Sequence, residues 1–296
     1  VYKRQALSLA LAGMAGSALG LNLSLGLLAG IAMTGITFVV VLGAVGRAVP
    51  PEKRGTAIGI ATAGGSFGQF MVVPLTQGLI TSFGWRETML LGAALALAIV
   101  VLARGIAGLP AGGPASAARQ QSLKEALGEA SRHPGYWLLN FGFFVCGFHV
   151  AFISTHLPAF LADQGLDPAI GARALALIGL FNILGSYVFG LSADKLRKKY
   201  VLSALYFARS AVIVAFLAVP FTPLSATLFA CAIGFLWLGT VPLTSGLVSQ
   251  IFGVRYLATL FGIVFMSHQV GGFFGAWLAG RFFEGTGSYD LSLIHI

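Results

Sequence analysis

Charged side chains are scarce in this chain of 296 residues, where Asp, Glu, Lys and Arg together make up 9%. A soluble globular domain has about 25% charged residues, which cover its surface. The apolar set AVILMFWYC accounts for 57% of the chain, and the mean hydropathy is +0.89. This composition excludes a soluble domain and predicts an all-α polytopic membrane protein whose surroundings are lipid.

Cysteines and intramembrane carboxylates are also few. The two cysteines, Cys146 and Cys231, lie in apolar runs and are expected to be buried thiols, neither disulfide-bonded nor metal-bound. No apolar segment carries Asp or Glu at depth, and the sequence contains no Ser-His-Asp set and no HExxH. These absences disfavour a membrane-embedded enzyme, and we expect no cofactor and no metal.

The apolar segments predict nine spans, because about 20 helical residues cross the hydrocarbon layer. Residues 1–5 and 291–296 resemble translated sequencing-adapter scars, so they are left out and the native protein is expected to be longer at both ends. A polar stretch, 110–133, separates an N-terminal bundle (1–109) from a C-terminal bundle (134–296), and its later part could form a short surface helix. The spans are 6–20, 23–46 (after a weak break at 20–22), 55–80, 87–109, 135–161, 170–193, 200–220, 224–251 and 257–283.

Basic residues predict the orientation of these spans. Lys and Arg gather in alternate loops, which is typical of membrane topology and does not indicate nucleic-acid binding despite the net charge of +9. The opposite loops hold only Arg86, Arg173 and Arg281. The basic side, which includes loop 110–133, is therefore predicted to be cytoplasmic. Its basic residues are Arg47, Lys53, Arg54, Arg104, Arg119, Lys124, Arg132, Lys195, Arg197, Lys198, Lys199 and Arg255.

Glycines recur at a nearly constant offset in the two halves. An offset of about 203 residues places Gly59 on Gly262 and Gly68 on Gly271. The segment that begins at Gly190 and continues through Asp194, Lys195, Arg197 and Lys198 has the pattern G-x-x-x-D-[RK]-x-[RK]-[RK]. It resembles the loop signature of the major facilitator superfamily. Further similar features are Pro51-Glu-Lys-Arg54-Gly55, Gly84-Trp85-Arg86 and the long central loop.

This resemblance implies a fold of two pseudo-symmetric helical bundles, with the nine spans as the third to eleventh of twelve. The segments Phe143–Phe152 and His156-Leu-Pro158 resemble bacterial relatives of the monocarboxylate porters. That family's better-known members carry an Asp and an Arg in the eighth span, where this chain has Asn182 and Ser186. The resemblance also implies that the cytoplasmic loop residues control gating: Gly190, Asp194, Lys195, Arg197, Arg255 and Arg54. Asp194 is expected to pair with Arg255 or a neighbouring base when the cytoplasmic side is closed.

Polar residues at mid-depth are the candidates for substrate binding or proton coupling, because lipid makes an unpaired polar group costly. In the superfamily, the first, fourth, seventh and tenth spans line the cavity, which favours His149, Thr37 and Thr240. The further candidates are Asn182, His268, Gln269 and Gln69.

Each candidate has a structural alternative. A Thr can bond its own helix, Asn182 and Gln69 can join helices, and His268 and His149 can be packing residues. A zinc site from His149 and His156 is disfavoured, since seven helical residues separate them by about 10 Å. Arg209 lies mid-span in 200–220, where it either faces an inward partner or extends toward the cytoplasm.

The sequence thus predicts a secondary transporter for a small organic solute, expected to be a monocarboxylate-like anion moved with H⁺ by a monomer. Its predicted location is the bacterial cytoplasmic membrane. A drug or metabolite exporter is the alternative, and a non-transporting receptor or an intramembrane enzyme is less favoured.

Overall fold

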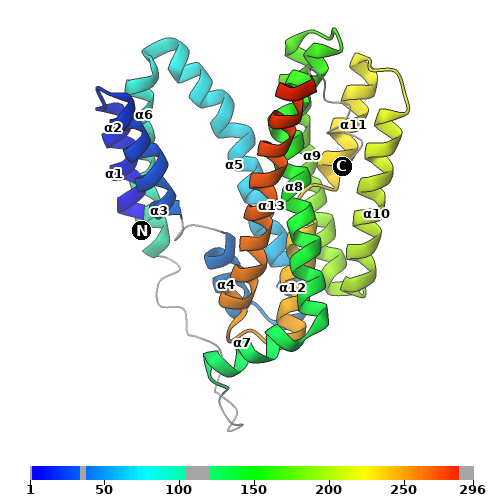
Figure 1. Ribbon diagram of the computed structural model, residues 1–296. Coiled ribbons are helices and arrows are strands. Elements are labelled where there is room, and N and C mark those ends of the chain that lie inside the picture. Colours follow the sequence, from blue (N-terminus) through cyan, green and yellow to red (C-terminus); the bar gives the residue numbers. More distant parts are fainter. Residues whose placement is uncertain (1, 34–37, 105–120, 287–296) are drawn as a thin grey trace. The chain divides into compact units, whose positions relative to one another are not determined.

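The structure is a computed structural model that describes residues 2–33, 38–104 and 121–286. In this part of the chain the regular elements are helices, without strands (Figure 1). The chain divides into two compact units, the first made of residues 1–48 and 68–116 and the second of 49–67 and 117–296. Helix α5 contributes to both units, so residues 49–67 group with the later part of the chain. The sequence-based division at 110–133 stays a prediction.

Unit 1 contains short and irregular helices. Its elements are α1 (Tyr2–Gly13), α2 (Ala18–Leu21), the π-helix η1 (Asn22–Leu28), α3 (Ala29–Met33), α4 (Phe38–Ala48), the later part of α5 (Arg54–Phe83) and α6 (Trp85–Arg104). The predicted break at residues 20–22 is wrong, because the chain leaves the helix at residues 14–17 instead. There the Ser17 hydroxyl accepts from the amide of Gly20 and caps α2, while Asn22 lies in a continuous helical run.

Unit 2 begins with the 3-10 helix η2 (Pro51–Lys53) and the first part of α5 and continues with the helices that follow the central loop. They are α7 (Leu123–Arg132), α8 (Pro134–Asp163), α9 (Pro168–Lys195), α10 (Lys198–Leu217), α11 (Pro223–Phe235), α12 (Thr240–Phe252) and α13 (Leu257–Thr286). The short surface helix expected in the central loop is α7. A capping box with Ser122 starts it, and the backbone hydrogen bond from Ser122 lowers the pKa of Glu125 below its usual range.

Six helical segments among the described residues are long and apolar enough to cross a membrane. They are Ala18–Val45, Pro134–Asp163, Pro168–Lys195, Lys198–Leu217, Pro223–Phe252 and Leu257–Gly285. The other three predicted spans fall on α1, α5 and α6, and α1 is too short to cross the layer unaided. The expectation of several spanning helices is confirmed, and the total of nine stays a prediction.

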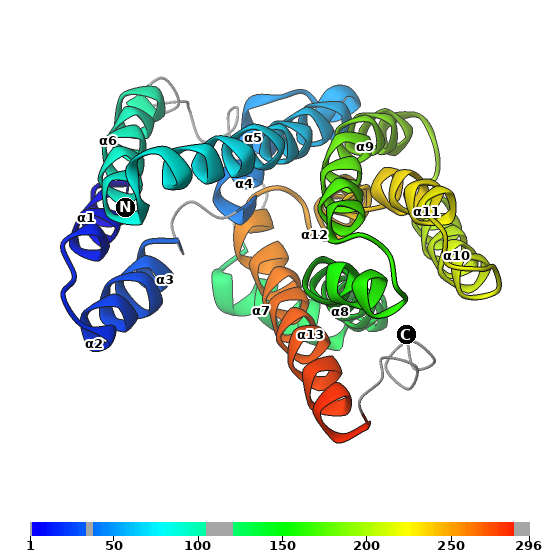
Figure 2. The same cartoon turned by 90° about the horizontal axis from the view of Figure 1, so that it is seen from above.

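Close backbone contact holds the helices of unit 2 together. Helices α8 and α13 run side by side (Figures 1 and 2). A Cβ atom added to Gly147 of α8 would collide with the carbonyl oxygen of His268 in α13, and one added to Gly185 of α9 would collide with that of Phe235 in α11. In lipid such contacts replace the hydrophobic effect as the source of helix association, which accounts for glycine at these two positions.

Candidate functional site

The span predicted at 224–251, which is the tenth of twelve in the superfamily's order and is called the tenth span below, consists of two helices and not one. Helix α11 ends at Phe235, α12 begins at Thr240, and residues 236–239 form a non-helical break between them. A break inside a membrane span releases backbone amide and carbonyl groups that water cannot reach, so other protein groups have to bond them. In this chain, side chains from two neighbouring helices do so.

Arg209 binds the carbonyl side of the break. Its Nη2 donates to the carbonyl oxygens of Leu236, at 2.5 Å, and Trp237, at 2.6 Å, and its Nη1 lies 3.3 Å from the Cys146 sulfur. The guanidinium also lies over the Tyr206 ring, 5.7 Å from its centroid, and Arg209 is only 1% exposed. Of the two orientations that the sequence allows, the inward one is therefore realised.

Helix α10 is at the periphery of unit 2, beside α11 (Figure 2). Phe207 and Val214 of α10 are largely exposed, as expected for side chains that face lipid. Arg209 is on the opposite face of that helix. Sequence reasoning identified the unusual depth of this arginine but not its partners, because these are main-chain carbonyls that only the break makes available.

Thr240 is brought into the same cluster. Its hydroxyl lies 3.3 Å from the sulfur of Cys146, and both residues are fully buried. The Cys146 thiol therefore connects Arg209 with the first residue of α12. The chain of contacts joins α8, α10 and α12 at the break.

Asn182 binds the amide side of the break. Its Oδ1 accepts from the amide of Leu238, at 3.0 Å, and from the Ser186 hydroxyl, at 3.2 Å. Its Nδ2 donates to the Ser66 hydroxyl of α5, at 2.6 Å. Asn182 is 1% exposed and joins α9 and α5 to the break. This arrangement favours the helix-joining alternative for Asn182 over direct contact with a solute.

His149 of α8 and His268 of α13 are both buried. His149 is 7% exposed, and its ring is edge-on to Phe148 with centroids 6.4 Å apart. His268 stacks on Phe265 at 5.5 Å and lies 4.9 Å from Phe143, which fits the packing alternative. Gln269 is exposed, and its Oε1 lies 3.2 Å from Nδ1 of His268. Thr37 falls outside the described residues, and Gln69 lies in α5 with its side chain outside them.

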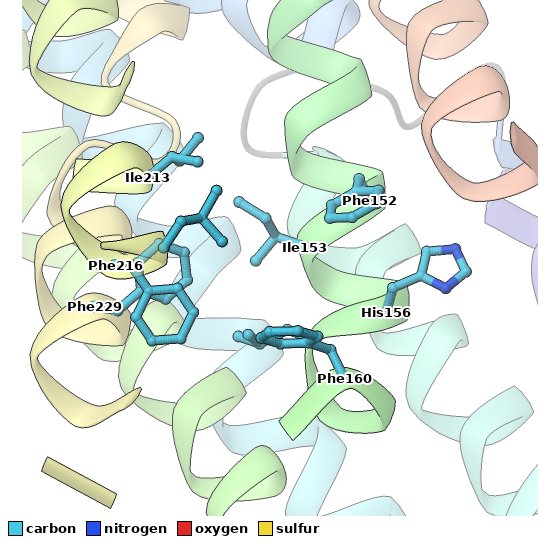
Figure 3. Close-up of a pocket in the computed structure, with 9 residues that line it drawn as sticks. Phe152, Ile153, His156, Phe160, Ile213, Phe216 and Phe229 are labelled. Atoms are coloured by element: carbon cyan, nitrogen blue, oxygen red, sulfur yellow. The ribbon is translucent and has the colours of Figure 1, made fainter. Parts of the chain in front are cut away.

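An apolar pocket between α8, α10 and α11 is too small for a solute, since it encloses about 20 Å³ (Figure 3). Its walls are hydrophobic apart from His156, which in Figure 3 points away from Phe216 and Phe229. Nε2 of His156 bonds the carbonyl oxygen of Ala276 in α13, at 2.9 Å. An apolar void of this size is a packing feature of unit 2.

Asp194 forms a second polar cluster at the end of α9. Its carboxylate accepts from the amides of Gly55 and Thr56, both at 2.7 Å, and from the Thr56 hydroxyl, at 2.6 Å. These partners are at the N-terminus of α5, where the helix dipole and the unpaired amides attract an anion. In this structure Asp194 thus bonds the N-terminus of α5, and its expected pairing with Arg255 or a neighbouring base stays a prediction.

Glycines permit this contact between α5 and α9. A Cβ atom on Gly190 would lie 2.8 Å from the carbonyl oxygen of Gly55 and 2.9 Å from the Cα atom of Gly59. The predicted gating residue Gly190 thus acts by letting two backbones meet. The sequence contained the signal for this, since Gly55 and Gly59 open a glycine-rich span.

The basic residues near this contact have different surroundings. Nη1 of Arg54 lies 3.4 Å from the Ser249 hydroxyl, and both line a recess with Asp194 and Lys198. Arg255 lies over the Tyr256 ring at 5.3 Å. Lys195 is exposed in the last turn of α9, and Arg197 is the exposed N-cap of α10. Within the described residues, no group of three His, Cys, Asp or Glu side chains is placed to hold a metal ion.

Known proteins resemble the chain in both sequence and fold. It is 28% identical to the uncharacterized MFS-type transporter YcxA of Bacillus subtilis over 254 residues, which is 80% of this chain and 60% of that protein. It is also 28% identical to monocarboxylate transporter 13 of Bos taurus, over 98% of this chain and 67% of that protein. The chain therefore spans about two thirds or less of the length of these relatives, both of which are named as transporters.

Solved structures show the same fold. A variant of the Escherichia coli fucose:proton symporter FucP matches with a TM-score of 0.76 and 16% identity, over 97% of this chain and 76% of that chain. The proton:xylose symporter XylE matches with a TM-score of 0.62, over 97% of this chain and 73% of that chain. The family model described as Major Facilitator Superfamily matches residues 3–276, nearly the whole sequence. The chain therefore belongs to the major facilitator superfamily.

Proposed function

We propose that the full-length protein is a secondary transporter that moves a small organic anion together with protons. The observation that carries this proposal is the positive character of the interior of unit 2. Arg209 is buried at mid-span, and the sequences of α10, α11 and α12 contain no Asp or Glu. The partners of Arg209 are two carbonyl oxygens, a thiol and an aromatic ring, and in a low-dielectric interior a cation whose partners are neutral still attracts anions strongly.

The names of the curated relatives support an anionic substrate, and those of the solved structures support proton coupling. Two of them are named monocarboxylate transporters, 12 and 13, and the two solved structures are named proton symporters. We propose further that the protein acts as a monomer in a bacterial cytoplasmic membrane, with loop 110–133 and residues 194–199 on the cytoplasmic side.

His149 is the proposed proton-coupling residue. It is buried in α8, and an imidazole with an ordinary pKa of about 6.5 exchanges protons near physiological pH. Its protonated form would strengthen anion binding, and by linkage a bound anion would strengthen protonation. Proton–anion symport requires this mutual strengthening of proton binding and anion binding.

A pH series tests the coupling. Uptake of a radiolabelled monocarboxylate panel by the full-length protein in proteoliposomes should rise about tenfold between pH 8 and pH 5.5, because lower pH protonates His149. In His149→Gln the rise should vanish, since Gln hydrogen-bonds but does not titrate. The matched control His156→Gln, on the same helix, should keep the rise. If His149→Gln keeps both the wild-type rate and pH profile, the assignment fails.

Cysteine labelling tests the orientation. Gln121→Cys and Lys198→Cys should resist a membrane-impermeant maleimide in intact cells and react after permeabilisation. The control Gln164→Cys, exposed at the opposite end of α8, should react in intact cells. Ready labelling of both Gln121→Cys and Lys198→Cys before permeabilisation would reverse the proposed orientation.

A further inference from the structure

The break at residues 236–239 has its backbone groups bonded from two sides. Arg209 of α10 binds two carbonyl oxygens, and Asn182 of α9 binds the amide of Leu238. Buried main-chain groups without partners are costly in lipid, so the conformation of the break depends on these two side chains. Neither side chain belongs to the span that it holds.

The two sides differ in what else they touch. The other guanidinium contacts of Arg209 are to Cys146 of α8 and to the ring of Tyr206 on its own helix, so it ties the break to α8 and α10. The carboxamide of Asn182 also donates to Ser66 in α5, at 2.6 Å. One rigid planar group therefore holds α5 with its nitrogen and the break with its oxygen. A movement of α5 that removes Ser66 frees this group to rotate away from Leu238.

The face of α5 that carries Ser66 also contacts α9. It does so through small residues and through its hydrogen bonds to Asp194 of α9. The Ser66–Asn182 bond lies on the α5 face that also carries the Gly55 and Gly59 contacts with Gly190. A separation of α5 from α9 would therefore break the Asp194 bonds and the Ser66 bond together. The break would then lose its amide partner while it keeps its Arg209 partner.

We propose that Arg209 and Asn182 are positioning residues that hold the break in the tenth span, and that Asn182 transmits movement of α5 to this break through Ser66. The inference rests on the proposed transport function. It assigns to Asn182 a role in conformational coupling in place of solute contact. We call these two sets of hydrogen bonds to the break the clamp. The bonds from Arg209 persist, whereas the bond from Asn182 to the Leu238 amide forms and breaks as α5 moves.

Hydrogen–deuterium exchange of peptides that cover residues 236–241 tests the clamp on the full-length protein in detergent, without any substrate. Asn182→Ala should speed exchange of these amides at least about tenfold, and Ser66→Ala about fivefold, in line with the loss of a buried hydrogen bond. The matched controls are Asn140→Ala, whose side chain bonds its own helix at Tyr136, and Thr62→Val, which bonds Ile58 within α5. Both should leave this exchange unchanged.

Arg209 is tested by two substitutions, because the neutral one risks poor folding. Arg209→Lys keeps the charge but cannot bond both carbonyls and Cys146 in the same planar geometry, so exchange at residues 236–241 should rise about fivefold. Arg209→Met should raise it further. Peptides from α13 report global stability and should exchange at the wild-type rate in Arg209→Lys.

Counterflow separates positioning from solute binding. Asn182→Ala should lower the maximum rate at least about tenfold while KM stays within about twofold, because a loosened break slows the conformational step. A raised KM with unchanged exchange would mean that Asn182 contacts the solute and would overturn the inference, as would unchanged exchange in Ser66→Ala. If the wild type moves no anion, the proposed function fails, and the exchange results still decide whether the clamp exists.

Discussion

Gly147→Ala should lower the free energy of unfolding of the full-length transporter by about 2–3 kcal/mol, the upper range for overpacking. The added Cβ atom would collide with the carbonyl oxygen of His268 and would lie 2.7 Å from its carbonyl carbon. Main-chain atoms in the middle of α13 have no rotamer through which to move away. The two helices would have to separate along their contact, and dispersion contacts on both sides would be lost.

The matched control for this change is Gly179→Ala. Gly179 is buried in α9, but no atom lies within 4 Å of its added Cβ. Alanine is favoured over glycine in a helix by about 0.5–1 kcal/mol, so this variant should be slightly more stable than the wild type. Unfolding in mixed SDS and mild detergent, followed by tryptophan fluorescence, measures both. Equal effects of the two substitutions would show that α8 and α13 do not pack as described.

Asp194→Asn should weaken the contact between α5 and α9 by about 2–3 kcal/mol, because hydrogen bonds to a charged group contribute about 1.5–3 kcal/mol. The carboxylate has two oxygens that accept from Gly55 and Thr56, whereas the amide offers one oxygen and presents an NH₂ group to amide donors. The loss of the negative charge at the N-terminus of α5 adds to the effect.

Such a change shifts a two-state equilibrium between closed and open forms of this contact about 30- to 150-fold. Ser249→Cys, in the recess beside Asp194 and Arg54, reports opening. Its reaction with a maleimide should accelerate at least about tenfold in the Asp194→Asn background, and counterflow should slow. Asp167→Asn is the control, since Asp167 caps only its own helix at Ala169. Labelling that is equally slow in both backgrounds would contradict the role of Asp194.

Several predictions from sequence agree closely with the structure for a physical reason. The spans predicted at 135–161 and 170–193 correspond to α8 (Pro134–Asp163) and α9 (Pro168–Lys195). In lipid a helix bonds its own backbone groups, so apolar length alone determines where it runs. The family resemblance at Gly190 and Asp194 could likewise be recognised from the sequence, because the motif lies in one continuous segment. The family match confirms the resemblance.

By itself, the sequence determined the class of the protein, the limits of its longer spans in unit 2 and the polar residues that lipid makes costly. Only the tertiary structure decided which backbone groups those residues bind. The Arg209 carbonyl partners are 27 and 28 residues away, the Leu238 amide is 56 residues from Asn182, and Ser66 is 116 residues from it. The break in the tenth span follows from the same cause. Its apolar residues predict one continuous helix. The hydrogen bonds that stabilise the non-helical conformation of the break come from helices that meet it only in the folded chain.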